Sequence, residues 1–184
     1  MNSVNKIILF SLIFLLTSCF SMKPGSKSKA SKYFATFYVD AGVNQYFIKP
    51  IEYDGKQNGF FSFDISFRDK LIKDVGADLR FSYMSESPAP VIDSITFVNE
   101  SGRIVIINIE KIFFEKKGDN FHFRGLSNIA SEQFTSIFNE EGLKVLVYHE
   151  GKIEEFDSDS DSRDAFNYIK SELLSILKLQ KYVD

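Results

Sequence analysis

Residues Phe60–Arg68 read FFSFDISFR, and apolar and polar side chains alternate from Phe61 to Arg68. Successive side chains of a β-strand point to opposite faces of the sheet. The period of two therefore predicts a strand with one buried face and one face in contact with water. The residues predicted to face the core are Phe61, Phe63, Ile65 and Phe67, and those predicted to face water are Ser62, Asp64, Ser66 and Arg68.

The chain on either side of this stretch also has the character of strands, as far as residue 125. Six more segments predict strands: Phe34–Asp40, Gln45–Tyr53, Asp78–Tyr83, Ser94–Asn99, Arg103–Glu115 and Asn120–Arg124. Turn-forming pairs such as Asp54-Gly55 and Ser101-Gly102 separate several of them. Because parallel strands need a long crossover connection, these short turns predict antiparallel neighbours. The stretch Arg103–Glu115 is long for one strand and starts apolar on both sides, which predicts a central strand or one covered on both faces.

A helical period replaces the strand pattern after Gly125. One apolar stripe with helical spacing consists of Ala130, Phe134, Ile137 and Phe138. Ser131 is the expected cap of this helix, and Gly142 is its expected stop. Two further strands are predicted over Leu143–Glu150 and Ile153–Phe156, with a turn between them.

The chain ends in a predicted amphipathic helix from Arg163 to Lys181. Its apolar stripe consists of Phe166, Ile169, Leu173, Ile176 and Leu177. The predicted fold class is therefore α+β: an antiparallel β-rich domain, arranged as a sheet, a sandwich or a half-barrel, packed by two helices from the C-terminal half. With 20 Phe, 8 Tyr and no Trp, aromatic rings must supply much of the interior, either as a core or as the lining of a pocket.

The N-terminus carries an export signal. Lys6 precedes the apolar run Ile7–Leu16, which only Ser11 interrupts. This run is shorter than the roughly 20 apolar residues of a membrane-spanning helix. It matches the core of a secretory signal, which ends in small residues.

The signal ends in Leu16-Thr17-Ser18-Cys19, which resembles the lipobox of bacterial lipoproteins. In that family the cysteine thiol receives a diacylglyceryl group, a peptidase cuts before the cysteine, and the new N-terminus is commonly acylated, for example with palmitate. The resemblance implies that residues 1–18 are removed and that Cys19, the only cysteine, is the lipidation site. Two acyl chains on Cys19 hold a protein stably on a membrane. The composition, rich in Lys, Ser, Phe and Ile, is also similar to that of spirochaetal lipoproteins.

A basic tether links the anchor to an acidic domain. Residues 19–32 lack a periodic apolar pattern and predict a flexible linker that carries four lysines and no acid. Residues 33–184, which we expect to form a single globular domain, contain 17 basic and 25 acidic residues, a net charge of −8. Nucleic acid is therefore not an expected partner, because its phosphates need a basic face.

The sequence lacks a recognisable catalytic set. It has no glycine-flanked nucleophile elbow, no phosphate-binding glycine loop and no zinc-protease helix. His122 is predicted to face water from a strand, and His149 precedes a turn. A zinc site needs three or four ligands, and the neighbours of these histidines do not complete one. We therefore expect no enzymatic activity, cofactor or metal.

An acidic run, Asp157-Ser158-Asp159-Ser160-Asp161, precedes the last helix. Its alternating aspartates match the start of an EF-hand calcium loop, which also needs a glycine at position six and a glutamate at position twelve. Counted from Asp157, those positions hold Ser162 and Tyr168. We interpret the run as a solvated loop that caps the helix through Asp161 or Ser162, with weak calcium binding at Asp157–Asp161 as the alternative.

These observations predict a lipoprotein of the cell envelope that binds a partner without catalysis. Phe20 stands where an aspartate favours inner-membrane retention in enteric-type sorting, so the outer membrane is favoured over the inner. The expected partners are the membrane, through the lipid anchor, and an unidentified protein or host ligand. A group of exposed aromatics on the folded surface would support this hypothesis. The alternative is a periplasmic lipoprotein for envelope assembly or for carriage of a small apolar ligand.

Overall fold

The structure is a computed structural model that describes residues 30–40, 42–55, 59–139 and 143–174. The signal segment 1–18, the expected lipidation site Cys19 and most of the tether lie outside the described residues. The same holds for Gly142, the expected stop of the first long helix, and for Ile176 and Leu177 of the last helix.

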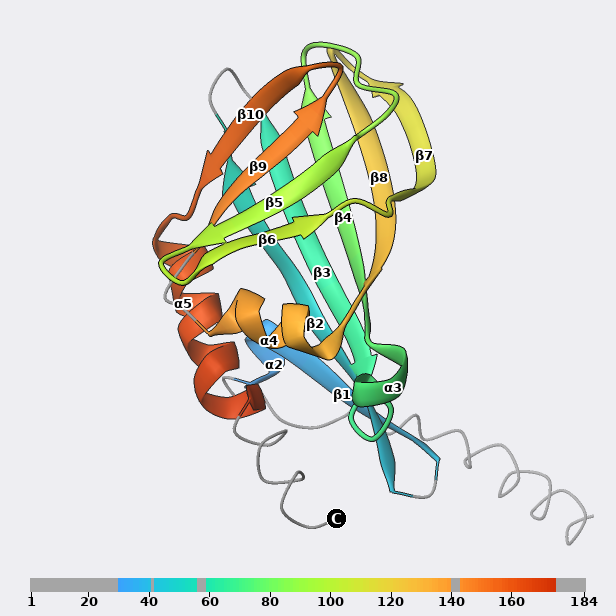
Figure 1. The fold of residues 1–184 in the computed structure, drawn as a ribbon, viewed down its shortest axis with the longest axis vertical. Helices are drawn as coiled ribbons and strands as arrows, with labels where there is room; N and C mark the ends of the chain where they lie inside the picture. The colour runs from blue at the N-terminus through green and yellow to red at the C-terminus, as the bar shows by residue number, and fades with distance from the viewer. Residues whose placement is uncertain (1–29, 41, 56–58, 140–142, 175–184) are drawn as a thin grey trace, which may run out of the picture.

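Ten described strands form two antiparallel sheets (Figure 1). The large sheet has the order β1 (Phe34–Asp40), β2 (Val43–Asp54), β3 (Phe60–Arg68), β4 (Ala77–Ser85), β8 (Asn120–Ile129), β7 (Glu110–Lys117). The small sheet has the order β10 (Lys152–Asp157), β9 (Lys144–His149), β5 (Ser94–Asn99), β6 (Gly102–Ile106). The predicted α+β class with antiparallel strands is confirmed.

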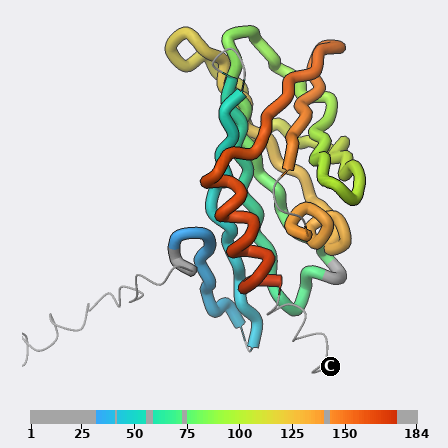
Figure 2. The backbone as a smooth tube through the Cα atoms, turned by 90° about the vertical axis from the view of Figure 1, so that its left-hand side faces the viewer, coloured from blue at the N-terminus to red at the C-terminus, as the bar shows by residue number. Residues whose placement is uncertain are grey.

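Two helices complete the layer that faces the large sheet. The helix α4 (Ser131–Phe138) lies beside β6, and α5 (Ser160–Tyr168), continued by the π-helical segment η1 (Ile169–Leu173), lies along β2 (Figure 1, Figure 2). Two short helices, α2 (Ala30–Tyr33) and α3 (Ile72–Val75), precede β1 and β4. Among the described residues, both longer helices pack on the side of the large sheet that also holds the small sheet. We call this side the inner face and the opposite side the outer face.

The phenylalanines form the core. Phe63 of β3 is fully buried, and its ring centroid lies 5.1 Å from that of Phe97 in the small sheet and 6.3 Å from that of Phe166 in α5. Near the C-terminal end of β3, the ring centroid of Phe67 lies 4.8 Å from that of Phe134 in α4. Besides the rings just named, the fully buried phenylalanines of the described residues are Phe61, Phe81, Phe123, Phe138 and Phe156. Because these rings contact one another, they fill the space between the layers, as close-packed interiors do.

The prediction of one strand over Arg103–Glu115 is wrong. The chain leaves the small sheet after Ile106 and enters the large sheet at Glu110, so the stretch is two strands, β6 and β7. A short irregular segment joins them, in which the Ile109 amide donates to the Ile107 carbonyl at 3.1 Å. The first half is also not central, since β6 is an edge strand. Period-two alternation continues across the junction, and alternation does not reveal which sheet each half joins.

The helix caps differ from those predicted. Ser131 is the first helical residue of α4, and the preceding Ala130 donates its amide hydrogen to Oε1 of Gln133 at 3.0 Å. The last helix begins at Ser160 and not at Arg163, and its cap is Asp159 and neither Asp161 nor Ser162. The Asp159 carboxylate accepts the Ser162 amide hydrogen at 2.8 Å, which satisfies one of the unpaired donors of the first turn.

Candidate functional site

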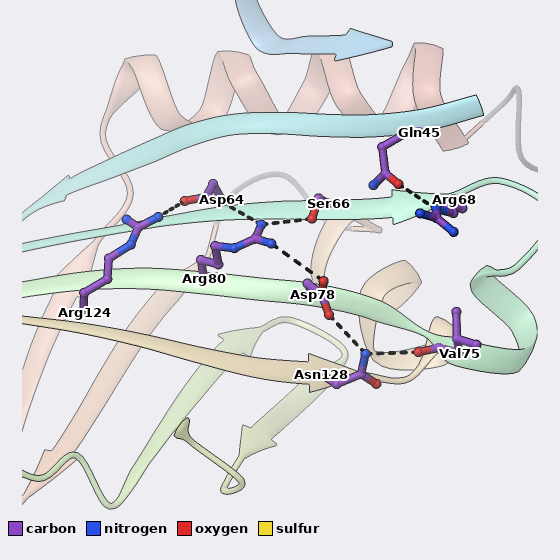
Figure 3. Close-up of polar contacts among 9 residues, drawn as sticks. All are labelled: Gln45, Asp64, Ser66, Arg68, Val75, Asp78, Arg80, Arg124 and Asn128. Carbon is purple, nitrogen blue, oxygen red and sulfur yellow. Dashed lines mark hydrogen bonds and ion pairs between the residues drawn. The ribbon is translucent and has the colours of Figure 1, made fainter. Parts of the chain in front are cut away.

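The outer face of the large sheet carries a row of paired charges at its centre (Figure 3). Asp64 of β3 and Arg80 of β4 are register partners, and Arg124 comes from β8, the next strand. Side chains directly opposite each other on neighbouring antiparallel strands project from the same face. The alternation that buries Phe63 and Ile65 thus also places Asp64 on the outer face.

A single carboxylate holds both guanidinium groups. Arg124 donates to Asp64 Oδ2 at 2.6 Å and to the Ser82 hydroxyl at 2.8 Å. Arg80 donates to the Ser66 hydroxyl at 2.9 Å and lies 3.7 Å from Oδ1 of Asp64. A second carboxylate, Asp78, lies 3.7 Å from Arg80. The side chains of Arg80 and Arg124 remain 32% and 25% exposed, so they are oriented by the sheet and still accessible from solvent.

Exposed aromatic rings flank these charges on both sides. Towards β1, Phe37 and Phe47 are 50% and 41% exposed and meet edge to face with their centroids 5.6 Å apart. Towards β7, the exposed Phe113 is the register partner of Arg124. The outer face therefore combines arginines with phenylalanines, and both residue types are enriched in protein interfaces.

His122 lies on this face near Phe113, but it is mostly covered and does not simply face water. Its side chain is 15% exposed, and the Phe113 ring packs edge to face against it at 4.9 Å. Both ring nitrogens are buried without a hydrogen-bond partner, since the nearest carboxylate oxygen, of Glu115, is 3.8 Å from Nδ1. Burial lowers the pKa of His122, and the positive charges of Lys117 and Arg124 lower it further, while Glu115 opposes the shift.

Acidification is expected to destabilise the wild-type protein more than a His122→Gln variant. Because the folded state lowers the pKa of His122, the unfolded chain binds more protons at this site below about pH 6.5. The stability that the protein has with neutral His122 is therefore complete above that pH, and it is lost as the pH falls through the folded-state pKa of His122. Denaturant titrations at several pH values between about pH 7 and pH 5 give the free energy of unfolding at each pH, and its slope against pH is compared between the two proteins. Equal slopes for both proteins would contradict the prediction.

His149 lies in the core, in a contact that the sequence did not reveal. It is fully buried, its Nε2 atom lies 3.0 Å from the Tyr83 hydroxyl, and the same atom lies 3.3 Å from Oε1 of Glu154. Burial, and next the hydrogen bond to Glu154, raise the pKa of the Tyr83 hydroxyl. The contact joins β4 of the large sheet to β9 and β10 of the small sheet. The imidazole has no solvent exposure, whereas the Glu154 side chain is 30% exposed, so this polar cluster links the two sheets and reaches solvent through Glu154.

The acidic run before α5 is engaged in helix capping and in a surface pocket. Hydrogen bonds from the Ser162 backbone and side chain lower the pKa of Asp159. A pocket of about 360 Å³ has Asp159, Asp161, Glu52, Asp54 and Lys32 in its lining. Within the described part of the chain, no group of three His, Cys, Asp or Glu side chains is arranged to hold a metal ion. The calcium alternative at Asp157–Asp161 therefore gains no support from the arrangement of these carboxylates.

Sequence reasoning did not identify the Asp64, Arg80 and Arg124 cluster. The available signal was that Asp64 lies on the polar side of the best alternating strand, while Arg80 and Arg124 lie within other predicted strands. Arg124 reaches Asp64 because β8 pairs with β4 in the large sheet. Since β5, β6 and β7 lie between these two strands in the chain, the sequence does not show that they pair.

Comparison of the chain with models of protein families, with curated proteins and with solved structures finds no match. In the described ranges, none of the helices has the length and apolar character needed to cross a membrane.

Proposed function

We propose that this protein is a lipid-anchored lipoprotein of the cell envelope that binds a protein partner without catalysis, through the outer face of its large sheet. The anchor is Cys19, implied by Leu16-Thr17-Ser18-Cys19. The outer membrane is the favoured location, and an outward orientation would make a host molecule the partner.

The observation that carries this proposal is the combination of held arginines and exposed rings on the outer face. Asp64 fixes Arg124 before any partner arrives, so less side-chain freedom is lost on binding. Phe47 and Phe113 offer apolar area on either side of the charges. This chemistry fits a protein segment that carries a carboxylate between apolar side chains, because guanidinium groups bind carboxylates in a defined geometry.

The alternative of a periplasmic lipoprotein divides into two cases. Carriage of a small apolar ligand is disfavoured, because the buried phenylalanines contact each other and fill the interior. A role in envelope assembly uses the same outer face with a periplasmic partner, and it differs only in which side of the membrane holds the domain.

The anchor and the orientation are tested in intact cells. A Cys19→Ser variant of the full chain is expected to move from the membrane fraction to the soluble fraction, since the acyl chains are lost. Protease added to intact cells is expected to digest the wild-type domain if it faces outward, whereas protection until lysis would place it in the periplasm. Retention of Cys19→Ser in the membrane would contradict the lipid anchor.

The binding face is tested with a photo-crosslinking residue in the full, anchored protein. At position 47, on the outer face, it is expected to form a discrete adduct with a partner, and Arg124→Gln is expected to remove most of that adduct. The matched positional control is Ile153, which is exposed on β10 of the small sheet. The matched substitution control is Arg103→Gln, at an exposed arginine of β6. Adducts of equal yield at both positions, or insensitive to Arg124→Gln, would argue against this face.

A further inference from the structure

His122 leaves its polar atoms unsatisfied on the outer face of the large sheet. Both of its ring nitrogens are buried without a hydrogen-bond partner, and among the described residues no other side chain leaves two polar atoms in that state. A neutral imidazole has one donor and one acceptor to satisfy, so this burial costs stability. Unsatisfied groups of this kind are rare in folded proteins, and a functional role is one of their known causes.

The ring of Phe113 covers the imidazole. The two rings pack edge to face, with their centroids 4.9 Å apart and their planes at 89°. Phe113 comes from β7, where it is the register partner of Arg124, and it is therefore a diagonal neighbour of His122 on the same face. The Phe113 side chain is 37% exposed and is not part of the core cluster. Its ring can therefore move into solvent without opening the core.

The charged groups around His122 come from β7 and β8. Oε1 of Glu115 lies 3.8 Å from Nδ1 of His122, and the two nearby cations are Lys117 and Arg124. On the other side, β4 places the uncharged Met84 opposite His122. Burial, as the largest cause, and the charge of Lys117 lower the pKa of His122 below its ordinary value. The imidazole is therefore neutral at neutral pH and takes up a proton only in acid.

We propose that His122 is an acid-operated switch of the outer face: when its imidazole takes up a proton, the Phe113 ring moves into solvent, and His122 joins Arg124 in binding a carboxylate of the partner. Protonation makes both ring nitrogens donors. Nδ1 can donate to Glu115 after a small movement of that exposed side chain, whereas Nε2 has no acceptor among the described residues. A buried charge with an unpaired donor is costly, and the cost falls once the ring above it leaves and water or a ligand enters.

Movement of Phe113 also opens the place where a carboxylate can bind. Because Phe113 is the register partner of Arg124, its displacement uncovers the surface beside a guanidinium group that Asp64 already holds at 2.6 Å. His122 lies two residues away on the same strand and projects from the same face. Charge-assisted hydrogen bonds from both groups bind a carboxylate more strongly than those from one, and the second cation exists only in acid. This regulation of binding rests on the proposed function, whereas the movement of Phe113 does not.

The movement is tested with 4-fluorophenylalanine at position 113 of the full, lipidated protein in detergent. A soluble, neutral paramagnetic agent relaxes the fluorine nucleus according to its exposure, which the field of a nearby charge does not alter. As the pH falls from about 7.5 to about 5, the exposure is expected to rise in one step, and His122→Gln is expected to abolish that step. The matched positional control is 4-fluorophenylalanine at position 47, also exposed on the outer face, where no step is expected.

The two charges on β7 are expected to shift the step in opposite directions. Glu115→Gln removes a carboxylate that favours the protonated imidazole, so its step is expected at lower pH than in the wild type. Lys117→Gln removes a cation that disfavours it, so its step is expected at higher pH. Both side chains are exposed, and neither substitution is expected to unfold the protein. No step in the wild type, the same step in His122→Gln, or a change at positions 113 and 47 together, as unfolding produces, would overturn the proposal.

The effect on binding is measured separately, with the photo-crosslinking residue at position 47 of the full, anchored protein. The yield of the partner adduct is expected to rise as the pH falls from about 7 to about 5, and to stay constant in His122→Gln. Movement of Phe113 with an adduct yield that does not change with pH would overturn the role of His122 in binding. Movement of Phe113 without an adduct at any pH would contradict the proposed function and leave the switch itself intact.

Discussion

Replacing Phe63 with alanine is expected to lower the free energy of unfolding by about 3–5 kcal/mol. Phe63 is fully buried in β3, and its ring lies against those of Tyr53, Phe97 and Phe166 at centroid distances of 6.1, 5.1 and 6.3 Å. These partners come from the large sheet, the small sheet and α5. Alanine would remove the ring that joins the three elements and would leave a cavity that close-packed neighbours fill only partly.

The measurement is the denaturant midpoint and slope of the full protein, followed by circular dichroism. The matched control is Phe47→Ala, which removes the same ring from the same sheet where it is 41% exposed on the outer face. Its cost is expected to be about 1–2 kcal/mol, because the ring is already partly in contact with water and loses its contact with Phe37 without leaving an enclosed cavity. A loss of equal size in both variants would mean that Phe63 does not carry the contacts between the layers.

Local pattern was sufficient for much of the fold. The strands predicted at Phe34–Asp40, Phe60–Arg68 and Ser94–Asn99 have the same bounds in the structure. The turn after His149 was also predicted, and Glu150 and Gly151 adopt φ angles of 49° and 74° there, as a tight hairpin turn requires. Alternation and turn chemistry are properties of neighbouring residues, so one sequence reveals them.

The pairing of strands that are far apart in the chain could not be predicted from local pattern. The sequence gives no reason for the chain to change sheets between Ile106 and Glu110, because each half of the stretch alternates equally well. Nor does it indicate that His149 meets Tyr83, 66 residues earlier in the chain. Both facts depend on the order of strands in the two sheets, and local alternation does not specify that order.

The residues of the candidate site could likewise be predicted only in part. The polar side of β3 was evident from the alternation around Asp64, and a group of exposed aromatics was the expected mark of a binding protein. Which charges meet Asp64 depends on β8 crossing back to pair with β4. A single carboxylate shared by Arg80 and Arg124 therefore appears only once the sheet is assembled.

The last helix provides a second prediction of large effect. Leu173→Asp is expected to lower the free energy of unfolding by about 3–5 kcal/mol, the usual cost of leaving a charge buried without a partner. Leu173 is fully buried in η1, the continuation of α5, on the same stripe as the buried Phe166 and Ile169. The loss is expected to shrink in acid, because a buried carboxyl group can escape the cost by taking up a proton.

The matched control is Ser171→Asp, which places the same charge two residues away on the exposed side of the helix. It is expected to change stability by no more than about 0.5 kcal/mol. Denaturant titrations of both variants at neutral and acidic pH separate burial of the charge from a general effect on the helix. If Leu173→Asp were as stable as Ser171→Asp, the apolar stripe would not be held in the core, and its role would be to bind a partner. A selective loss at Leu173 means that α5 and η1 belong to the scaffold, which leaves the outer face of the large sheet as the proposed binding surface.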